Sequence, residues 1–191
     1  MEFNRNQRLA KRIVLVDGLA NSGKAMHGAI ISSMGNSEQF VLMDKTFDYL
    51  LRVYHMNKIS IDALKTYINV LVDYELYDLQ LARNVNFNQT DASSIYKSAD
   101  LKRYKERTKI VDNKNILSKI ESNNPILVLM LHDAINFSKI LHETLGERLL
   151  GHIFAQRHPL SVFFDIIERR QTSRLFSDRR VFELFLVKNN I

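Results

Sequence analysis

One stretch, Lys11 to Ala25, constrains the fold more than any other part of the chain. A short apolar run, Ile13–Val16, predicts a buried strand that ends at Asp17-Gly18. Small residues then lead to Gly23-Lys24, and an apolar segment with helical spacing continues to about Met34. A strand, a glycine-bounded loop and a helix in this order form the context of a phosphate-binding loop. The sequence therefore predicts an anion-binding loop near its start.

The residue types in this loop suit an anion. A helix N-terminus presents unpaired N–H groups and a partial positive charge. Gly18 and Gly23 let the backbone curl without Cβ clashes, and Lys24 adds a full charge. The next residue is Ala25, where a nucleotide hydrolase has the Ser or Thr hydroxyl that binds magnesium. We therefore expect a phosphate site that works without a metal; the alternative is an ordinary tight turn between a strand and a helix.

Composition is that of an ordinary globular protein. The chain has 191 residues, of which 46% are hydrophobic and 25% charged, so we expect a single domain over residues 1–191. It has no cysteine, which excludes disulfides, thiol catalysis and cysteine-bound metals. Its apolar runs are far shorter than the ~20 residues that cross a bilayer. Its first residues lack the apolar core of a signal peptide. These features predict a cytoplasmic protein without a membrane span.

The net charge of +6 is compatible with a nucleic acid, an anionic nucleotide or an acidic substrate as partner. The basic residues are dispersed along the chain, however, and no nucleic-acid-binding motif is present in the sequence. We therefore expect no nucleic-acid partner.

The middle of the chain predicts mainly helices. A short apolar run at 40–43 is compatible with a second strand, and residues 46–122 have the pattern of a helical insertion. Its longest helix is expected from Ser60, a good N-cap, to about Arg83. A polar loop follows at 84–98, and it is either a solvated connector or a segment that contacts an anionic ligand. The residues that could make this contact are Ser93, Ser94, Tyr96 and Lys97.

Two further apolar runs predict buried strands, at 126–131 and 149–155. Together with the helical segments between them, they indicate an α/β fold with a central parallel sheet. Ligands of such sheets bind at the carboxyl ends of the strands. We therefore expect the loop Gly18–Lys24, His132 and Arg157 to lie close together, each following one strand.

These motifs resemble those of sulfotransferases of the phosphate-loop (P-loop) class, and in particular the bacterial and marine sulfotransferase-like proteins. The resemblance extends from about Ile13 to Arg170. It rests on four motifs in the same order: Gly-Leu-Ala-Asn-Ser-Gly-Lys at 18–24, Ser-Ser-Ile-Tyr-Lys-Ser at 93–98, Asn-Pro-Ile-Leu-Val-Leu-Met-Leu-His-Asp at 124–133, and Arg-His-Pro at 157–159.

The resemblance implies a P-loop nucleotide-binding fold and a role for each motif. The first loop would bind the phosphosulfate end of the donor, 3′-phosphoadenosine 5′-phosphosulfate, and no metal would be needed. His132 would be the base that deprotonates the acceptor hydroxyl, and Arg157 would bind the donor's 3′-phosphate. The acceptor would be a carbohydrate or a small metabolite. The residues implied for the first loop are Asn21, Ser22, Gly23, Lys24 and Ala25, with Lys24 also stabilising charge during catalysis.

Two alternatives stay open. In a P-loop nucleotide kinase or NTPase, Asp133 would serve as the magnesium-binding carboxylate beside the glycine-containing loop. In a catalytically inactive sulfotransferase-like binding protein, the loop would be a remnant of the fold. Three departures from the family favour the second alternative: Asn21 stands where a basic residue is usual, Asp165 stands where a serine is usual, and the chain ends soon after Arg170.

Overall fold

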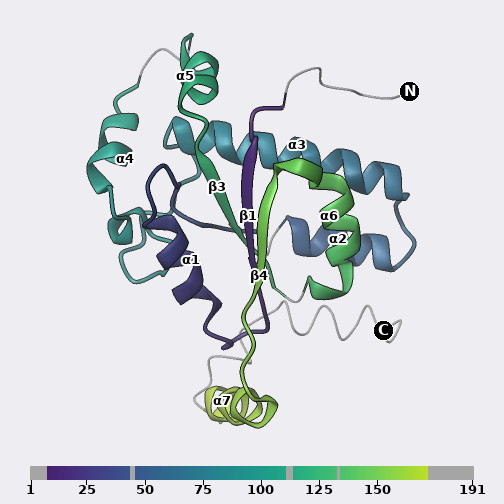
Figure 1. Cartoon of the computed structure of the whole chain (residues 1–191). Coiled ribbons are helices and arrows are strands. Elements are labelled where there is room, and N and C mark those ends of the chain that lie inside the picture. Colours follow the sequence, from purple (N-terminus) through teal and green to yellow (C-terminus); the bar gives the residue numbers. More distant parts are fainter. Residues whose placement is uncertain (1–7, 44–45, 111–113, 133, 172–191) are drawn as a thin grey trace.

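The computed structural model describes residues 8–43, 46–110, 114–132 and 134–171 (Figure 1). A four-stranded sheet forms the centre, with the spatial order β2-β3-β1-β4 and parallel pairing throughout. Its strands are β1 (Arg12–Asp17), β2 (Val41–Leu42), β3 (Ile126–Met130) and β4 (Leu149–Phe154). The predicted α/β architecture with a central parallel sheet is thus confirmed, and the run at 40–43 does contain a strand.

Helices cover both faces of this sheet. The α-helices of the described residues are α1 (Lys24–Ser32), α2 (Phe47–His55), α3 (Ile61–Gln80), α4 (Leu101–Arg107), α5 (Ile116–Asn123), α6 (Ser138–Leu145) and α7 (Pro159–Gln171). Short 3₁₀ helices are η1 (Ile95–Lys97), η2 (Ile135–Phe137) and η3 (Gly146–Arg148). The Ser60 hydroxyl caps α3 by accepting a hydrogen bond from the Ala63 N–H at 3.2 Å, as the sequence predicts. The predicted helical insertion corresponds to α2–α5, between β2 and β3.

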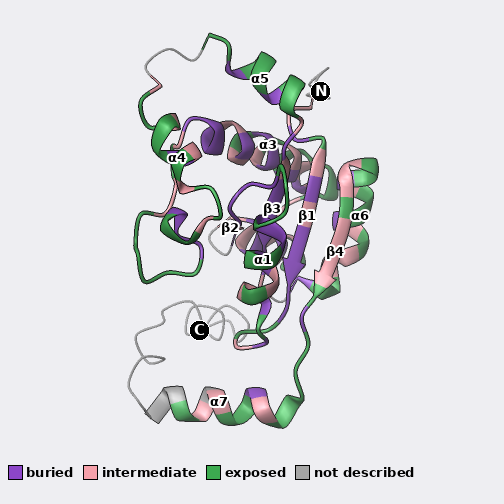
Figure 2. Ribbon diagram, turned by 60° about the vertical axis from the view of Figure 1, so that its left-hand side comes forward, coloured by how far each residue is buried: buried purple, intermediate pink, exposed green. Residues whose placement is uncertain are grey.

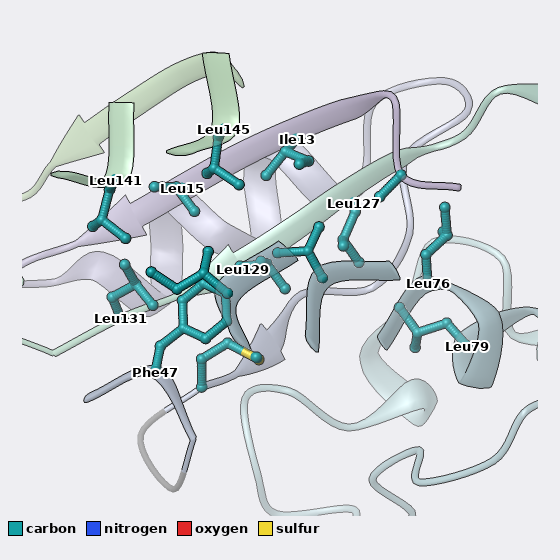
Figure 3. Close-up of a cluster of buried hydrophobic side chains, with 14 of the residues drawn as sticks. Ile13, Leu15, Phe47, Leu76, Leu79, Leu127, Leu129, Leu131, Leu141 and Leu145 are labelled. Atoms are coloured by element: carbon teal, nitrogen blue, oxygen red, sulfur yellow. The ribbon is translucent and has the colours of Figure 1, made fainter. Parts of the chain in front are cut away.

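The central strands β1, at residues 13–16, and β3 are continuously apolar because both of their faces are largely buried, whereas β4 is half-exposed. Alternate residues point into two separate cores. On one face, Ile13 and Leu15 of β1 belong to the larger core, which is packed against α2, α3, α5 and α6 (Figure 3). On the other face, Val16 belongs to a smaller core beneath α1 that also includes Phe40 and Met130. Deleting a large side chain from such a core costs about 2–5 kcal/mol of stability.

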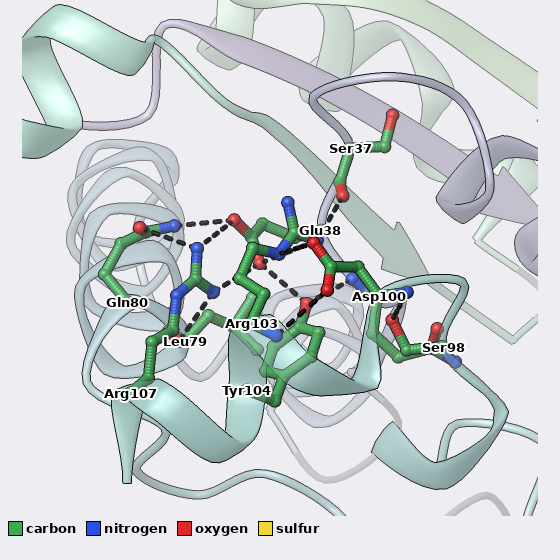
Figure 4. A network of polar contacts seen from close by, with 10 residues as sticks. Ser37, Glu38, Leu79, Gln80, Ser98, Asp100, Arg103, Tyr104 and Arg107 are labelled. Atoms are coloured by element: carbon green, nitrogen blue, oxygen red, sulfur yellow. Dashed lines mark hydrogen bonds and ion pairs between the residues drawn. The ribbon is translucent and has the colours of Figure 1, made fainter. Parts of the chain in front are cut away.

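A buried polar cluster fixes the segment that leads into β2 (Figure 4). The Glu38 carboxylate accepts hydrogen bonds from Gln80, from the Tyr104 hydroxyl and from both terminal nitrogens of Arg107, at 2.6–2.9 Å. Gln80 belongs to α3, and the other two partners belong to α4. We call these four residues the Glu38 cluster. It ties the helical insertion to the sheet.

The topology also identifies the edge of the sheet where a ligand of such a fold would bind. The loop after β1 leads to α1 on one face of the sheet, whereas the loop after the neighbouring strand β3 leads to α6 on the other face. Parallel sheets bind ligands at the carboxyl ends of strands where the connections diverge in this way. Beyond these ends lies α7 (Figures 1 and 2). Within the described part of the chain, no helix has the length and apolarity needed to span a membrane.

Candidate functional site

The loop between β1 and α1, residues 18–23, has a backbone that few side chains allow. Gly18, Asn21 and Gly23 have φ angles of 146°, 65° and 92°. A Cβ at Gly18 would lie 2.5 Å from the carbonyl oxygen of Ala155 and 2.6 Å from Oγ of Ser22. Only glycine fits at position 18, because its neighbours leave no room. We call this segment the glycine loop.

The glycine loop leads into a helix end that favours negative charge. Helix α1 starts directly after Gly23, with no side-chain cap and no acidic residue in its first turn. The hydroxyl of Ser22 is buried and has no hydrogen-bond partner among the described residues. Buried hydroxyls without a partner are uncommon, because losing water costs about 1–3 kcal/mol. The glycine loop therefore contains a buried hydroxyl, without a hydrogen-bond partner among the described residues, beside the N-terminus of α1.

Lys24 lies beneath the loop rather than extending into solvent. Its side chain is buried, and its Nζ donates hydrogen bonds to the carbonyl oxygens of Gly18 at 2.7 Å and Leu19 at 3.0 Å. The ammonium thereby holds the loop in its curled shape. Ala25 follows on the same helix and supplies no hydroxyl.

Asp17, at the end of β1, is fully buried and joins two loops. Its Oδ1 accepts hydrogen bonds from the backbone N–H groups of Gly18 at 2.6 Å and Ala134 at 3.2 Å. Its Oδ2 lies 3.8 Å from Nε2 of His152. Burial by itself would raise the pKa of this carboxyl, but the contacts with His152 and the two N–H groups outweigh burial and lower the pKa. Asp17 is thus a buried carboxylate at the carboxyl end of β1 that favours its charged form.

His132 follows β3 and is oriented by a carboxylate from α2. The His132 backbone N–H donates to both oxygens of Asp48, at 3.1 and 3.2 Å, and its ring Nδ1 lies 3.6 Å from Oδ2 of Asp48. Asp48 is buried, whereas 31% of the His132 side chain is exposed. An imidazole held beside a buried carboxylate and open to solvent on one side is an arrangement suited to a general base.

Arg157 lies between β4 and α7 and reaches the glycine loop. Its Nη1 donates to the carbonyl oxygen of Asn21 at 3.0 Å and to Oδ2 of Asp165 at 2.6 Å. The guanidinium thus links α7 to the loop. It is also already paired with a carboxylate, which an incoming phosphate would have to displace.

The expected gathering of these groups is present in part. Arg157 contacts the glycine loop directly, through Asn21. His132 follows the neighbouring strand β3, and the segment after it is joined to the loop by the hydrogen bonds of Ala134 and Gly18 to Asp17. Asp133, the carboxylate of the kinase alternative, lies outside the described residues.

The second motif of the resemblance lies elsewhere. In the loop 84–98, the Ser93 hydroxyl accepts from Asn86 at 2.9 Å and the Ser94 hydroxyl caps η1. Lys97 donates to the Thr90 carbonyl oxygen at 2.9 Å. Ser93 also lines a cavity of about 530 Å³ that borders β2. In this structure these side chains maintain their own loop.

Sequence reasoning assigned no role to Asp17 or Asp48. The signal for Asp17 is its position directly after a buried apolar run, where a carboxylate marks the end of a strand. Asp48 has no comparable signal, because it is one acidic residue near the start of a predicted helix and its partner is 84 positions away.

In comparisons with known proteins, no family model, no curated protein and no solved structure matches this chain.

Proposed function

We propose that this chain is a sulfotransferase-like P-loop protein that binds 3′-phosphoadenosine 5′-phosphosulfate and transfers its sulfuryl group to a hydroxyl of a carbohydrate or small metabolite. The observation that carries the proposal is the glycine loop. Three residues with positive φ curl the backbone in front of an uncapped helix, and a buried lysine and an unpartnered buried serine hydroxyl lie beside it. Backbone N–H groups and a helix dipole in this geometry favour an anion of phosphate type.

The residues of the loop fit the phosphosulfate end of the donor. Ser22 offers a hydroxyl, and Lys24 offers an ammonium that would turn from two loop carbonyl oxygens to the oxygens of the donor. Charge on the transferring and leaving oxygens would be stabilised there, which is the largest requirement of such a reaction. Because Ala25 has no hydroxyl for magnesium, we infer that binding is independent of this metal.

In the proposed reaction, His132 takes the proton of the acceptor hydroxyl. The acceptor oxygen forms the new bond to sulfur, and the bond from sulfur to the 5′-phosphate oxygen breaks, so that 3′-phosphoadenosine 5′-phosphate leaves with the electron pair. Asp48 has a positioning role, since it holds the His132 segment by two backbone hydrogen bonds and lies beside the ring.

The 3′-phosphate end of the donor fits less well, because Arg157 is paired with Asp165. This ion pair is the specific observation in favour of the second candidate function, a catalytically inactive protein of the same type that binds a partner instead. The two candidates differ in whether Arg157 can leave Asp165 for a phosphate.

Calorimetric titration with 3′-phosphoadenosine 5′-phosphate, with and without magnesium, tests the proposal. We expect saturable binding that is independent of magnesium and at least tenfold weaker in Lys24→Ala and in Arg157→Ala. Asp165→Asn removes the competing charge and should strengthen binding, because Arg157 is then released. Unchanged binding in both the lysine and the arginine variants would remove the site assignment. Absence of binding in the wild type and in Asp165→Asn would favour the inactive alternative.

A further inference from the structure

A second group of chemically active side chains lies on the larger-core side of β4, outside the proposed donor site. His142 of α6 and His152 of β4 face each other, with Nε2 of His142 only 3.2 Å from Nδ1 of His152. Their rings meet edge to face, with centroids 5.4 Å apart. His142 is exposed, whereas only 6% of the His152 side chain is exposed. The His152 side of the pair is therefore buried, and the His142 side is accessible to solvent.

The buried end of the pair faces a carboxylate. On the far side of the His152 ring, Nε2 lies 3.8 Å from Oδ2 of Asp17, and this oxygen has no hydrogen-bond partner among the described residues. A negative charge at that position favours the form of His152 with its proton on Nε2. The lone pair of Nδ1 is then directed at His142. A metal-binding imidazole usually donates its other N–H to a carboxylate, and Asp17 and His152 would form this hydrogen bond if they moved closer by about 1 Å.

The distance between the two nitrogens is close to that between two imidazole ligands of one metal ion. Zinc binds imidazole nitrogens at about 2.0–2.1 Å, and tetrahedral geometry then places two such nitrogens about 3.3 Å apart. The observed 3.2 Å is close to this separation. The same distance also fits a simple hydrogen bond from one ring to the other. A proton would lie on the line between the two nitrogens, whereas a metal ion would lie to one side of it. Binding of a metal would therefore turn both rings so that their lone pairs converge on the ion, with the distance between the nitrogens almost unchanged.

We propose that His142 and His152 form a two-histidine binding site for a divalent transition-metal ion of the zinc type, with Asp17 as the positioning carboxylate. Imidazole is a preferred ligand of zinc, nickel and copper. The described residues contain no group of three or more His, Asp or Glu side chains that could hold a metal. Water would therefore fill the remaining coordination positions, and the affinity would be modest. The two histidines lie outside the glycine loop, whereas Asp17 borders both sites through its two oxygens. The proposal does not depend on the proposed function.

Titration of the full-length, untagged protein with zinc chloride, followed by calorimetry, tests this inference. We expect saturable binding of one ion per chain, weakened at least tenfold in His142→Ala. This variant should fold normally because His142 is exposed. His27→Ala is the matched control, since His27 lies on α1 on the opposite face of the sheet, and its binding should equal that of the wild type.

Cobalt(II) serves as a spectroscopic probe of the same site. Binding through two ring nitrogens should give visible absorption bands that disappear in His142→Ala and persist in His27→Ala. The proposal would be overturned by a wild type that takes up no zinc, or by a His142→Ala variant that binds zinc as tightly as the wild type does.

Discussion

Glu38 and Asp17 are both buried carboxylates, one before β2 and the other at the end of β1. They differ in how many hydrogen bonds their oxygens accept. Both oxygens of Glu38 accept two hydrogen bonds each, from Gln80, Tyr104 and Arg107. At Asp17, Oδ1 accepts two backbone hydrogen bonds, but Oδ2 has none among the described residues. Burial opposes ionisation of Glu38, yet Arg107 and Tyr104 outweigh it and lower its pKa.

This difference separates a structural cluster from a candidate site. Both carboxylate oxygens of Glu38 are paired with side chains of the helical insertion, although the nearby Ser37 hydroxyl and Arg103 Nε have no hydrogen-bond partner among the described residues. A carboxylate paired in this way fixes one packing of the insertion and has no oxygen left for a ligand. Around Asp17 and the glycine loop, a carboxylate oxygen and a serine hydroxyl are buried without a partner. Unmatched groups and left-handed backbone cost stability, and they are concentrated at functional sites.

The largest effect is expected from breaking the Glu38 cluster. Glu38→Ala leaves the buried Arg107 guanidinium without its carboxylate, so we expect a loss of about 3–5 kcal/mol in the free energy of unfolding. Urea unfolding followed by circular dichroism measures this loss. Glu143→Ala is the control, because the ion pair of Glu143 with Lys65 is largely exposed and its loss should cost about 1 kcal/mol or less. Equal losses in both variants would contradict the structural role of the Glu38 cluster.

A smaller effect is expected from forcing a side chain into the glycine loop. Gly18→Ala places a Cβ against the Ala155 carbonyl oxygen in a backbone conformation with positive φ. The conformational strain alone costs roughly 1–3 kcal/mol. In Gly151→Ala, the control on β4, the new Cβ meets no atom within 4 Å, and stability should be unchanged or slightly increased. A Gly18→Ala variant as stable as Gly151→Ala would show that the loop is not held in this conformation.

The sequence predicts the parts of the fold that depend on neighbouring residues. Apolar runs marked the strands, glycines marked the loop before α1, and Ser60 marked the start of α3. These signals are local because strand burial, turn geometry and capping are decided within a few positions. The gathering of the loop and Arg157 also followed from the rule that parallel strands end at one edge of the sheet.

The long-range contacts of Glu38 and of the candidate site could not be predicted from the sequence. The partners of Glu38 are 42 to 69 positions away, and Glu38 itself lies in a polar stretch that has no periodic pattern. Asp48 contacts the segment of His132 across 84 positions. Such pairs depend on how the helical insertion folds back on the sheet, and the hydrophobic periodicity of one element does not specify this.

The smallest effect is expected in a comparison of two buried serines, one that caps η1 in the helical insertion and one in the glycine loop. Ser94 accepts a hydrogen bond as the cap of η1, so Ser94→Ala should cost about 0.5–2 kcal/mol. The Ser22 hydroxyl has no partner among the described residues, and Ser22→Ala should change stability by less than about 0.5 kcal/mol or increase it slightly. Thermal unfolding of both variants measures the difference. If Ser22→Ala proved the more damaging of the two, the hydroxyl would already have a structural partner, and the argument that it is kept for a ligand would fail. If the expected order holds, the loss of this hydroxyl should weaken binding of 3′-phosphoadenosine 5′-phosphate while the fold remains intact.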